Sequence, residues 1–391
     1  MPTAAPVPRD QDSSGRQFDL CQLHDGIEGA VADRRDKRCR RARQGNRKHR
    51  NRNQNSMTRR HSGHPRAVHR LCIPMLLVAS CLPTACAALQ AEDTASLSTI
   101  AGAISRLPLE PAARLEIELA LKARNYSAVE EGLVRVASQH PKMPLLYNCL
   151  ARIFFIDGKY LNAAIAMKKA EALQPLEERD SFTLAMAYVA LEKPDWARPL
   201  LEKLAEDNAK NPLYVYWEGR LEYDQQKLSQ AAARFEKAIA LDSGFVKAYD
   251  NLGLCLEGMG KYTEALAQYQ RAVQLNRESK VHSAWPPLNL GMLLIKSNRG
   301  EEAEPLFRES LQWDANFAEA HYQLGVLLEQ HNRTNEATEG LKRAGLLAPA
   351  YPQPHYALAR VYRRSGKKEE AKRELEIFQT LNAKAQPPRL Q

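Results

Sequence analysis

The chain has 391 residues, and its 56 Lys and Arg against 46 Asp and Glu give a formal net charge of +10 at pH 7. A basic balance of this size is typical of proteins that bind nucleic acid or membrane surfaces. The whole excess, however, lies in residues 1–70, with 17 Lys and Arg against 7 Asp and Glu, whereas residues 71–391 hold 39 of each. The larger part of the chain is neutral, which argues against nucleic acid as its partner.

The cysteines and histidines show no metal-binding pattern. Five of the seven cysteines precede residue 90, and the other two, Cys149 and Cys255, are about a hundred residues apart. No Cys-x-x-Cys pair occurs and the histidines are scattered, so the spacing of a zinc site is absent. We therefore predict no disulfide between Cys149 and Cys255, no metal site and no cofactor.

Residues 1–56 form a basic segment with hardly any apolar periodicity, which predicts disorder. The run from Arg34 to Arg41 suggests a nucleic-acid-binding arm or a nuclear localisation signal. The alternative is that translation begins at Met57 and that residues 1–56 are an over-extended reading frame. N-terminal sequencing of the expressed protein distinguishes these alternatives.

Residues 57–88 have the order of a secretory leader, because four Arg precede an apolar stretch and then small residues. Val78 to Cys81 resembles a bacterial lipobox, which would make Cys81 the lipidated residue, while Ala85-Cys86-Ala87 fits an ordinary cleavage site. A third alternative keeps residues 71–89 as an uncleaved anchor, although its prolines make it a poor membrane span. We expect an exported protein that is periplasmic or anchored to the bacterial envelope, or a cytoplasmic one if the leader is not functional.

A 34-residue repeat follows a short helical lead-in over residues 89–109. The residues Tyr249, Leu252, Gly253, Ala265 and Tyr269 recur by type at the same offsets along the chain. The repeat divides residues 110–385 into eight units, and a disordered tail is predicted for 386–391. The units are 110–143, 144–177, 178–211, 212–245, 246–279, 284–317, 318–351 and 352–385.

This pattern resembles the tetratricopeptide repeat (TPR), which implies an all-α fold, a right-handed superhelical solenoid of tandem helix-turn-helix hairpins. Position eight of the unit is Gly or Ala in seven of eight units, and position twenty is Ala in seven of eight. Small residues there let two helices approach closely, while a large residue at position twenty-four fills the space beside them. Gly260 lies in a predicted turn, where it serves as a left-handed C-cap.

Three features depart from the pattern. The first unit has Glu116 and Val129 where Leu and Ala belong, and the fourth has Glu218 at a Leu position. Four residues, 280–283, are inserted ahead of Trp285. The insertion predicts either a longer loop, which we favour, or a local change of pitch that exposes Trp285 as a contact.

No sequence motif for catalysis is present, so we predict that the protein is not an enzyme and has no small-molecule substrate. The family resemblance implies a concave groove lined by positions two, five, nine and twelve of each unit, which binds a protein or peptide. It also implies a scaffold or adaptor, which the leader pattern of residues 57–88 would place in the cell envelope. The alternatives are a nucleic-acid-binding protein using the basic arm and a targeting subunit of an enzyme complex. The predicted groove residues are Tyr, Trp, Phe, Arg or Lys, mostly types enriched in binding hot spots: Arg152, Phe155, Tyr216, Arg220, Tyr223, Lys247, Trp285, Tyr322, Tyr356, Arg360 and Arg363.

Overall fold

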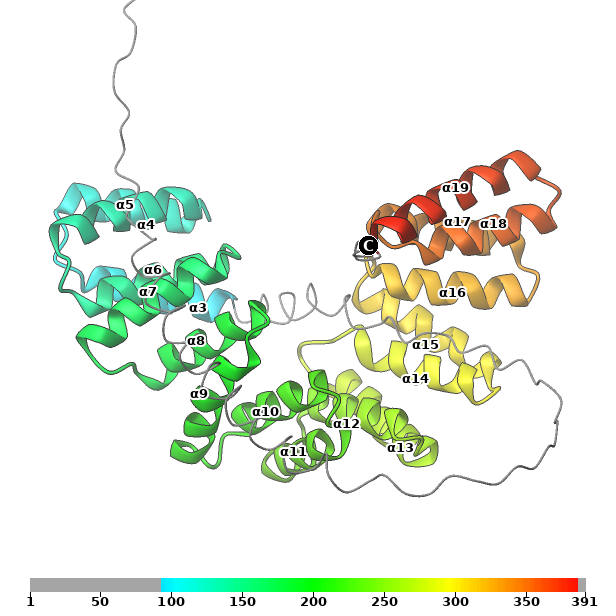
Figure 1. Cartoon of the computed structure of the whole chain (residues 1–391), viewed down its shortest axis with the longest axis horizontal. Helices are drawn as coiled ribbons and strands as arrows, with labels where there is room; N and C mark the ends of the chain where they lie inside the picture. The colour runs from blue at the N-terminus through cyan, green and yellow to red at the C-terminus, as the bar shows by residue number, and fades with distance from the viewer. Residues whose placement is uncertain (1–92, 386–391) are drawn as a thin grey trace, which may run out of the picture. The chain divides into compact units, whose positions relative to one another are not determined.

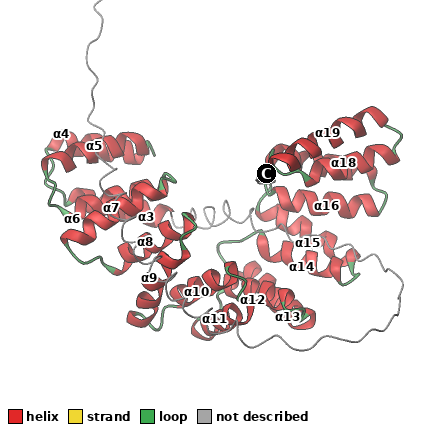
Figure 2. Cartoon of the chain, viewed as in Figure 1, coloured by secondary structure: helices red, strands yellow, loops and turns green. Residues whose placement is uncertain are grey.

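The computed structural model describes residues 93–385, and every regular element in that range is an α-helix (Figure 2). Helix α3 (Asp93–Ser105) comes first, and eight helical hairpins follow it (Figure 1). The hairpins are α4 (Pro111–Lys122) with α5 (Tyr126–Gln139), α6 (Pro144–Ile156) with α7 (Tyr160–Leu173), α8 (Glu178–Ala190) with α9 (Pro194–Asp207), α10 (Pro212–Asp224) with α11 (Leu228–Leu241), α12 (Val246–Gly258) with α13 (Tyr262–Glu278), α14 (Trp285–Lys296) with α15 (Gly300–Trp313), α16 (Ala318–Gln330) with α17 (Thr334–Leu347), and α18 (Gln353–Arg364) with α19 (Lys368–Ala385).

The turn inside every hairpin contains one residue with positive φ, always at position fifteen of the repeat unit. Three of these residues are glycines, and the predicted left-handed cap at Gly260 is confirmed by its φ of 78°. The other five have side chains and adopt the same conformation, which L-residues favour less. They are Arg124, Glu192, Gln226, Asn298 and Asn332. The turn geometry therefore follows the repeat even where the sequence lacks glycine.

Close packing between the two helices of a hairpin depends on the small residue at position eight. A Cβ atom on Gly291 would lie 2.6 Å from the ring of Phe307, and one on Gly325 would lie 2.7 Å from Leu341. Phe307 and Leu341 are fully buried. The predicted pairing of a small residue at position eight with a large one at position twenty-four is therefore confirmed.

The first hairpin uses the opposite arrangement of large and small residues. Ile117 occupies position eight and is buried, and Gly132 on α5 faces it, so that a Cβ on Gly132 would lie 2.7 Å from Ile117. Val129 is also fully buried. The degenerate first unit therefore keeps close helix contact because the glycine has moved to the second helix.

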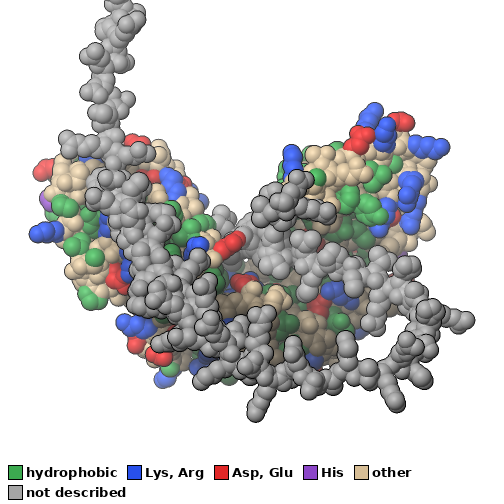
Figure 3. Space-filling model, in the orientation of Figure 1, with side chains coloured by type: hydrophobic (Ala, Val, Ile, Leu, Met, Phe, Trp, Pro, Cys, Tyr) green, Lys and Arg blue, Asp and Glu red, His purple; other side chains and the backbone are tan. Residues whose placement is uncertain are grey.

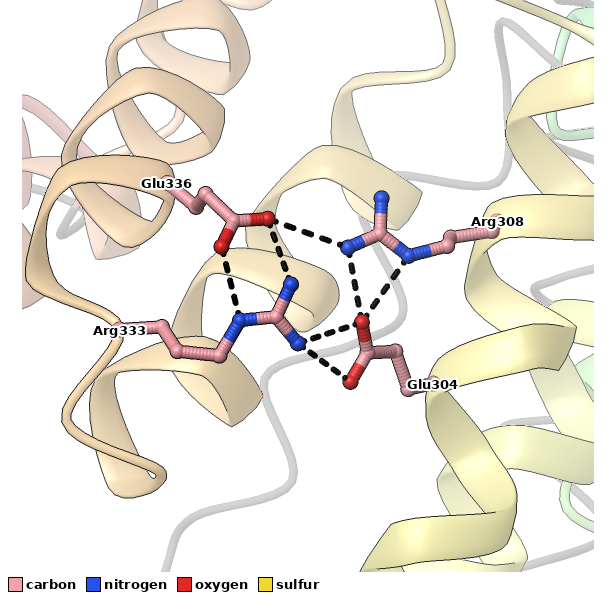
Figure 4. A network of polar contacts seen from close by, with 4 residues as sticks. All are labelled: Glu304, Arg308, Arg333 and Glu336. Atoms are coloured by element: carbon pink, nitrogen blue, oxygen red, sulfur yellow. Dashed lines mark hydrogen bonds and ion pairs between the residues drawn. The ribbon is translucent and has the colours of Figure 1, made fainter.

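Successive hairpins stack on one another, so that the described chain is an all-α solenoid. First helices of neighbouring units contact each other, as α6 contacts α8 and α16 contacts α18. Ion pairs join α15 to the start of α17: Arg333 donates to both Glu304 oxygens at 2.8 and 2.9 Å and also binds Glu336 (Figure 4). Arg308 contacts the same two carboxylates and closes the network (Figure 4).

The four inserted residues form an ordered loop between α13 and α14, in agreement with the favoured prediction. Asn276, 1% exposed, donates to the Ser283 carbonyl at 2.9 Å and accepts from the Ser283 amide at 2.8 Å. His282 stacks on Trp313 with the ring centroids 3.8 Å apart. Trp285 is half-buried with its ring against Phe317, so it is not a freely exposed contact.

Several predictions concern residues outside 93–385. The basic segment 1–56, the leader 57–88 with its candidate lipidation residue Cys81, and the tail 386–391 all lie outside the described residues. Among the helices that are described, none is both long enough and apolar enough to cross a membrane.

Candidate partner-binding surface

The eleven predicted groove residues all lie on the first helices of the hairpins. We define the first-helix surface as the surface formed by α4, α6, α8, α10, α12, α14, α16 and α18. The predicted residues lie on α6, α10, α12, α14, α16 and α18. Their environments differ greatly, which separates those that hold the solenoid together from those that remain accessible.

Tyr216 packs in the core. Its side chain is 7% exposed, and its ring contacts Phe235 and Phe245 with centroid distances of 5.5 and 5.0 Å. Burial raises the pKa of Tyr216 to about 12. Phe155 is half-buried and contacts the edge of Tyr160. Contrary to the groove prediction, Tyr216 offers almost no surface to a partner.

Two predicted arginines join neighbouring first helices. Arg152 on α6 donates to Oδ1 of Asp180 on α8 at 2.8 and 2.6 Å, and Asp180 is 1% exposed. Burial raises the pKa of Asp180, although Arg152 opposes this shift. Arg220 on α10 donates to Asn251 on α12 at 2.6 Å and lies over the Tyr223 ring. Both arginines therefore have structural partners before any ligand arrives.

A buried pair that the groove prediction missed links α12 to α14. Asn289 Nδ2 donates to both carboxylate oxygens of Asp250 at 3.0 Å, and both residues are buried. Burial raises the pKa of Asp250 to about 7, against the opposing effects of Asn289 and Arg220. Polar residues at positions five and six of successive units were the sequence signal for this link.

Acidic residues at position twelve bind basic residues of the next unit. Glu257 accepts from Lys296, and Glu329 accepts from Arg360 and faces Arg364 at 3.3 Å. The Glu329 side chain is only 4% exposed, whereas that of Arg364 is 64% exposed. One buried carboxylate therefore holds two guanidinium groups of α18 at the first-helix surface.

Three of the predicted residues lie on α18 and are accessible there. Tyr356 is 45% exposed, Arg363 is exposed, and the Arg360 side chain is 35% exposed. These residues are four and three positions apart, which puts them on one face of the helix. Lys and Arg side chains gather at the end of α18 next to α19 (Figure 3). The α18 face, defined as Tyr356, Arg360, Arg363 and Arg364, is therefore aromatic, basic and open.

Two of the remaining predicted residues are half-buried and one is exposed. Tyr322 on α16 lies with its ring against the edge of Tyr351, and burial raises its pKa. Tyr223 is also half-buried, whereas Lys247 on α12 is exposed. The two tyrosines present part of their surface to solvent and part to the neighbouring helices.

Two further arginines at predicted groove positions were missed. Arg114, at position five of the first unit, donates to the Leu107 carbonyl at 3.0 Å, and Arg179, at position two of the third unit, donates to Thr99 at 2.7 Å. Both partners belong to α3 or the segment just after it. The repeat register would have identified both arginines, because it already assigned these positions to the groove.

The described residues offer little reactive chemistry. Cys149 and Cys255 are free and buried, which confirms that they are not paired, and burial raises each thiol pKa to about 12. At that pKa the nucleophilic thiolate is scarce near neutral pH. Within residues 93–385 no three His, Cys, Asp or Glu side chains are grouped to hold a metal ion.

Several solved structures are similar to part of this chain. YrrB, a TPR protein with an unusual peptide-binding site, is 21% identical over 47% of this chain and 93% of its own, with a TM-score of 0.38. MamA is 17% identical over 42% of this chain and 95% of its own, with a TM-score of 0.38. PilW, a type IV pilus biogenesis factor, is 17% identical over 52% of this chain and 92% of its own, with a TM-score of 0.46.

Family comparison gives a direct assignment for the central part of the chain. A comparison with curated proteins finds no match. Tetratricopeptide-repeat family models match residues 182–244, 245–312 and 294–350. The matched residues coincide with the hairpins from α8 to α17, whose turns, small residues and stacking follow one register. The chain therefore contains tetratricopeptide repeats, within a solenoid of tandem helical hairpins.

Proposed function

We propose that this protein is a non-enzymatic scaffold of the cell envelope that binds a protein or peptide segment in a concave groove lined by the first helices. The observation that carries the proposal is the α18 face, where exposed Tyr356 and Arg363 stand beside the arginines held by Glu329. Aromatic and Arg side chains are the types that dominate binding energy at protein interfaces. Tetratricopeptide repeats are generally scaffolds rather than catalysts.

The chemistry of this face favours a segment that carries carboxylates. Arg360 and Arg364 share the single buried carboxylate of Glu329, so the pair retains net positive charge, and Arg363 adds another. Guanidinium groups bind carboxylates with charge-assisted hydrogen bonds, and a fixed guanidinium loses less side-chain entropy on binding. The ring of Tyr356 packs against Phe378 with the centroids 5.2 Å apart, and its exposed part supplies an adjoining apolar contact.

The test is a quantitative capture experiment with the full chain and envelope extract. Tyr356→Ala/Arg363→Glu changes the proposed contacts, and Lys342→Glu on α17 is a control that reverses a charge on an exposed second-helix residue. We expect proteins that are captured by the wild type and the control to be lost from the double variant. Identical captured sets for all three proteins would contradict the proposal.

The envelope location rests on the leader pattern of residues 57–88. Mass spectrometry of the mature N-terminus tests the start site, the lipidation and the compartment together. A diacylated N-terminal Cys81, or a mature chain beginning after Ala87, would support export. Native peptides from residues 17–33 would contradict the start at Met57.

A further inference from the structure

Helix α3 belongs to no hairpin, yet it is packed onto the solenoid. Its main contacts are with α4 and α6, the first helices of the first two hairpins (Figure 1). Thr99 on α3 also accepts the hydrogen bond from Arg179 at the start of α8. The helix therefore lies on the first-helix surface, the same surface that we propose as the partner-binding groove.

The apolar side of α3 is buried on this surface. Ile100 and Ile104 are fully buried and Ala103 is 1% exposed, and Leu107 just beyond the helix is equally buried. Gly102 and Ser105 on the other side are exposed. An apolar stripe at three- and four-residue spacing is the usual way in which a helix is recognised in a groove.

The polar contacts to α3 come from positions that the repeat register assigns to the groove. Arg179 holds position two of its unit, and Arg114, which binds the Leu107 carbonyl, holds position five. Nearby on α6, Asn148 also holds position five, and its Oδ1 is buried. The chain's own segment therefore makes the contacts expected of a ligand.

We propose that α3 is an internal ligand that occupies the first-helix surface of α4, α6 and α8, and that a partner helix with the same apolar stripe displaces it. This inference rests on the proposed groove binding and adds the partner class, an amphipathic helix with Ile or Leu at three- and four-residue spacing. The surface is closed while α3 is docked. The partner's apparent affinity is its intrinsic affinity multiplied by the fraction of molecules in which α3 is released.

A helix held on one side by the groove can open separately from the hairpins beneath it. Each hairpin of the solenoid is supported by its neighbours, as α6 is by α5, α7 and α8. The apolar side of α3 joins one core cluster with α4 to α7. In that cluster Leu133, Leu146 and Met167 lie on α5, α6 and α7, so these hairpins keep apolar partners of their own when α3 leaves. Local opening of α3 is therefore compatible with a folded solenoid.

The binding test uses the full chain and a fluorescein-labelled synthetic peptide of residues 93–109. Ile104→Asp places a charge in the buried stripe and releases α3, and Ser105→Asp places the same charge on the adjacent exposed residue. We expect the peptide to bind the Ile104→Asp protein about tenfold or more tightly than the wild type or Ser105→Asp. Equal affinity for all three proteins, or no binding to Ile104→Asp, would overturn the proposal.

Hydrogen exchange on the unaltered protein gives a second test that needs no destabilising substitution. We expect the amides of α3 to exchange before those of α4 to α7, and unlabelled peptide in excess to speed exchange in α3 alone. Exchange of α3 together with α4 to α7 in one step would show that α3 is an integral cap, which would overturn the proposal.

Two further outcomes separate this inference from its alternatives. If the wild type is a dimer by light scattering and the added peptide dissociates it, α3 docks onto a second copy and the internal ligand is ruled out. The peptide assay concerns α4, α6 and α8, whereas the capture experiment concerns α18. Failure of either one is therefore distinguishable from failure of the other.

Discussion

A Cβ atom on Gly253 would lie 2.5 Å from Cε1 of Tyr269, a contact that the two helices of this hairpin could not accommodate without moving. Tyr269 is fully buried, and its hydroxyl donates to Glu257 at 2.9 Å. Core packing and this hydrogen bond therefore fix the position of its ring. We expect Gly253→Ala to lower the free energy of unfolding by about 1–3 kcal/mol, the usual cost of overpacking a core. Urea denaturation measures the change.

Two matched variants test whether the close contact with Tyr269 causes this loss of stability. Gly345→Ala introduces the same methyl group on α17, where the nearest contact would be an ordinary 3.5 Å to His355, so it should be neutral or stabilising. Gly253→Ala/Tyr269→Leu recreates the Ala185 and Leu201 combination of the third unit and should recover part of the loss. Equal destabilisation by both single glycine substitutions would refute the close-contact explanation.

The hairpin turns supply a second prediction. Glu192 is exposed with a φ of 56°, a conformation in which its side chain is disfavoured. We expect Glu192→Gly to raise the free energy of unfolding by up to about 1 kcal/mol, because the relief of backbone strain outweighs the greater freedom of unfolded glycine. Thermal unfolding followed by circular dichroism measures the effect.

The reverse substitution is the control. Gly260 has a φ of 78°, and a Cβ atom added to it would have no neighbouring atom within 4 Å, so only the backbone conformation penalises a side chain there. Gly260→Ala should lower stability by about 1 kcal/mol. A gain from Gly260→Ala, or a loss from Glu192→Gly, would contradict the argument.

The fold could be predicted from the sequence because the same residue pattern occurs in successive units of one chain. One Gly-containing turn is weak information, but a turn at position fifteen of every unit follows from the shared register. The exchange of Ile117 and Gly132 in the first hairpin could not be anticipated, because the small residue that compensates lies on the other helix.

The candidate site was predicted less completely, for a physical reason. The register says which positions face the first-helix surface but not which neighbours reach them. Tyr216 and Tyr356 occupy the same position of their units, yet one is 7% and the other 45% exposed. Tyr216 is covered by Phe235 and Phe245, while Tyr356 lies in the last hairpin that the structure describes. Burial depends on these neighbours rather than on the repeat.

Asp250 provides a prediction about pH. Burial raises its pKa to about 7, well above the value of about 4 expected in an unfolded chain. Between these values the folded protein binds more protons than the unfolded one, so its stability falls as pH rises from about 4 to about 7. We expect Asp250→Asn to remove this slope and to be more stable than the wild type at pH 8.

The measurement is the free energy of unfolding in urea at pH 5, 6, 7 and 8. The difference between Asp250→Asn and the wild type should grow with pH by no more than about 1.4 kcal/mol per unit, the limit for one proton. Asp195→Asn changes an exposed residue of α9 and should leave the profile unaltered. Parallel profiles for the wild type and Asp250→Asn would show that Asp250 is ionised throughout.

Glu218 leads to the last prediction, because it holds a position where six of the other seven units have Leu. It is 5% exposed, and Arg234 Nη1 lies 3.1 Å from its carboxylate. Burial raises the pKa of Glu218, and Arg234 only partly opposes this. Removing a carboxylate from water costs more free energy than its attraction to one partly exposed arginine recovers. Replacing such an ion pair with apolar residues is therefore often stabilising.

We therefore expect Glu218→Leu to raise the free energy of unfolding at pH 7 by about 1 kcal/mol or more, since the leucine extends the apolar contact of its unit. Arg234 keeps a partner in Glu222, 3.7 Å away. Glu218→Gln removes the charge without adding apolar contact. Its free energy of unfolding should therefore lie between those of the wild type and the leucine variant. If both variants are less stable than the wild type, the ion pair itself stabilises the fourth hairpin, and the leucine of the repeat is not the better residue at this position.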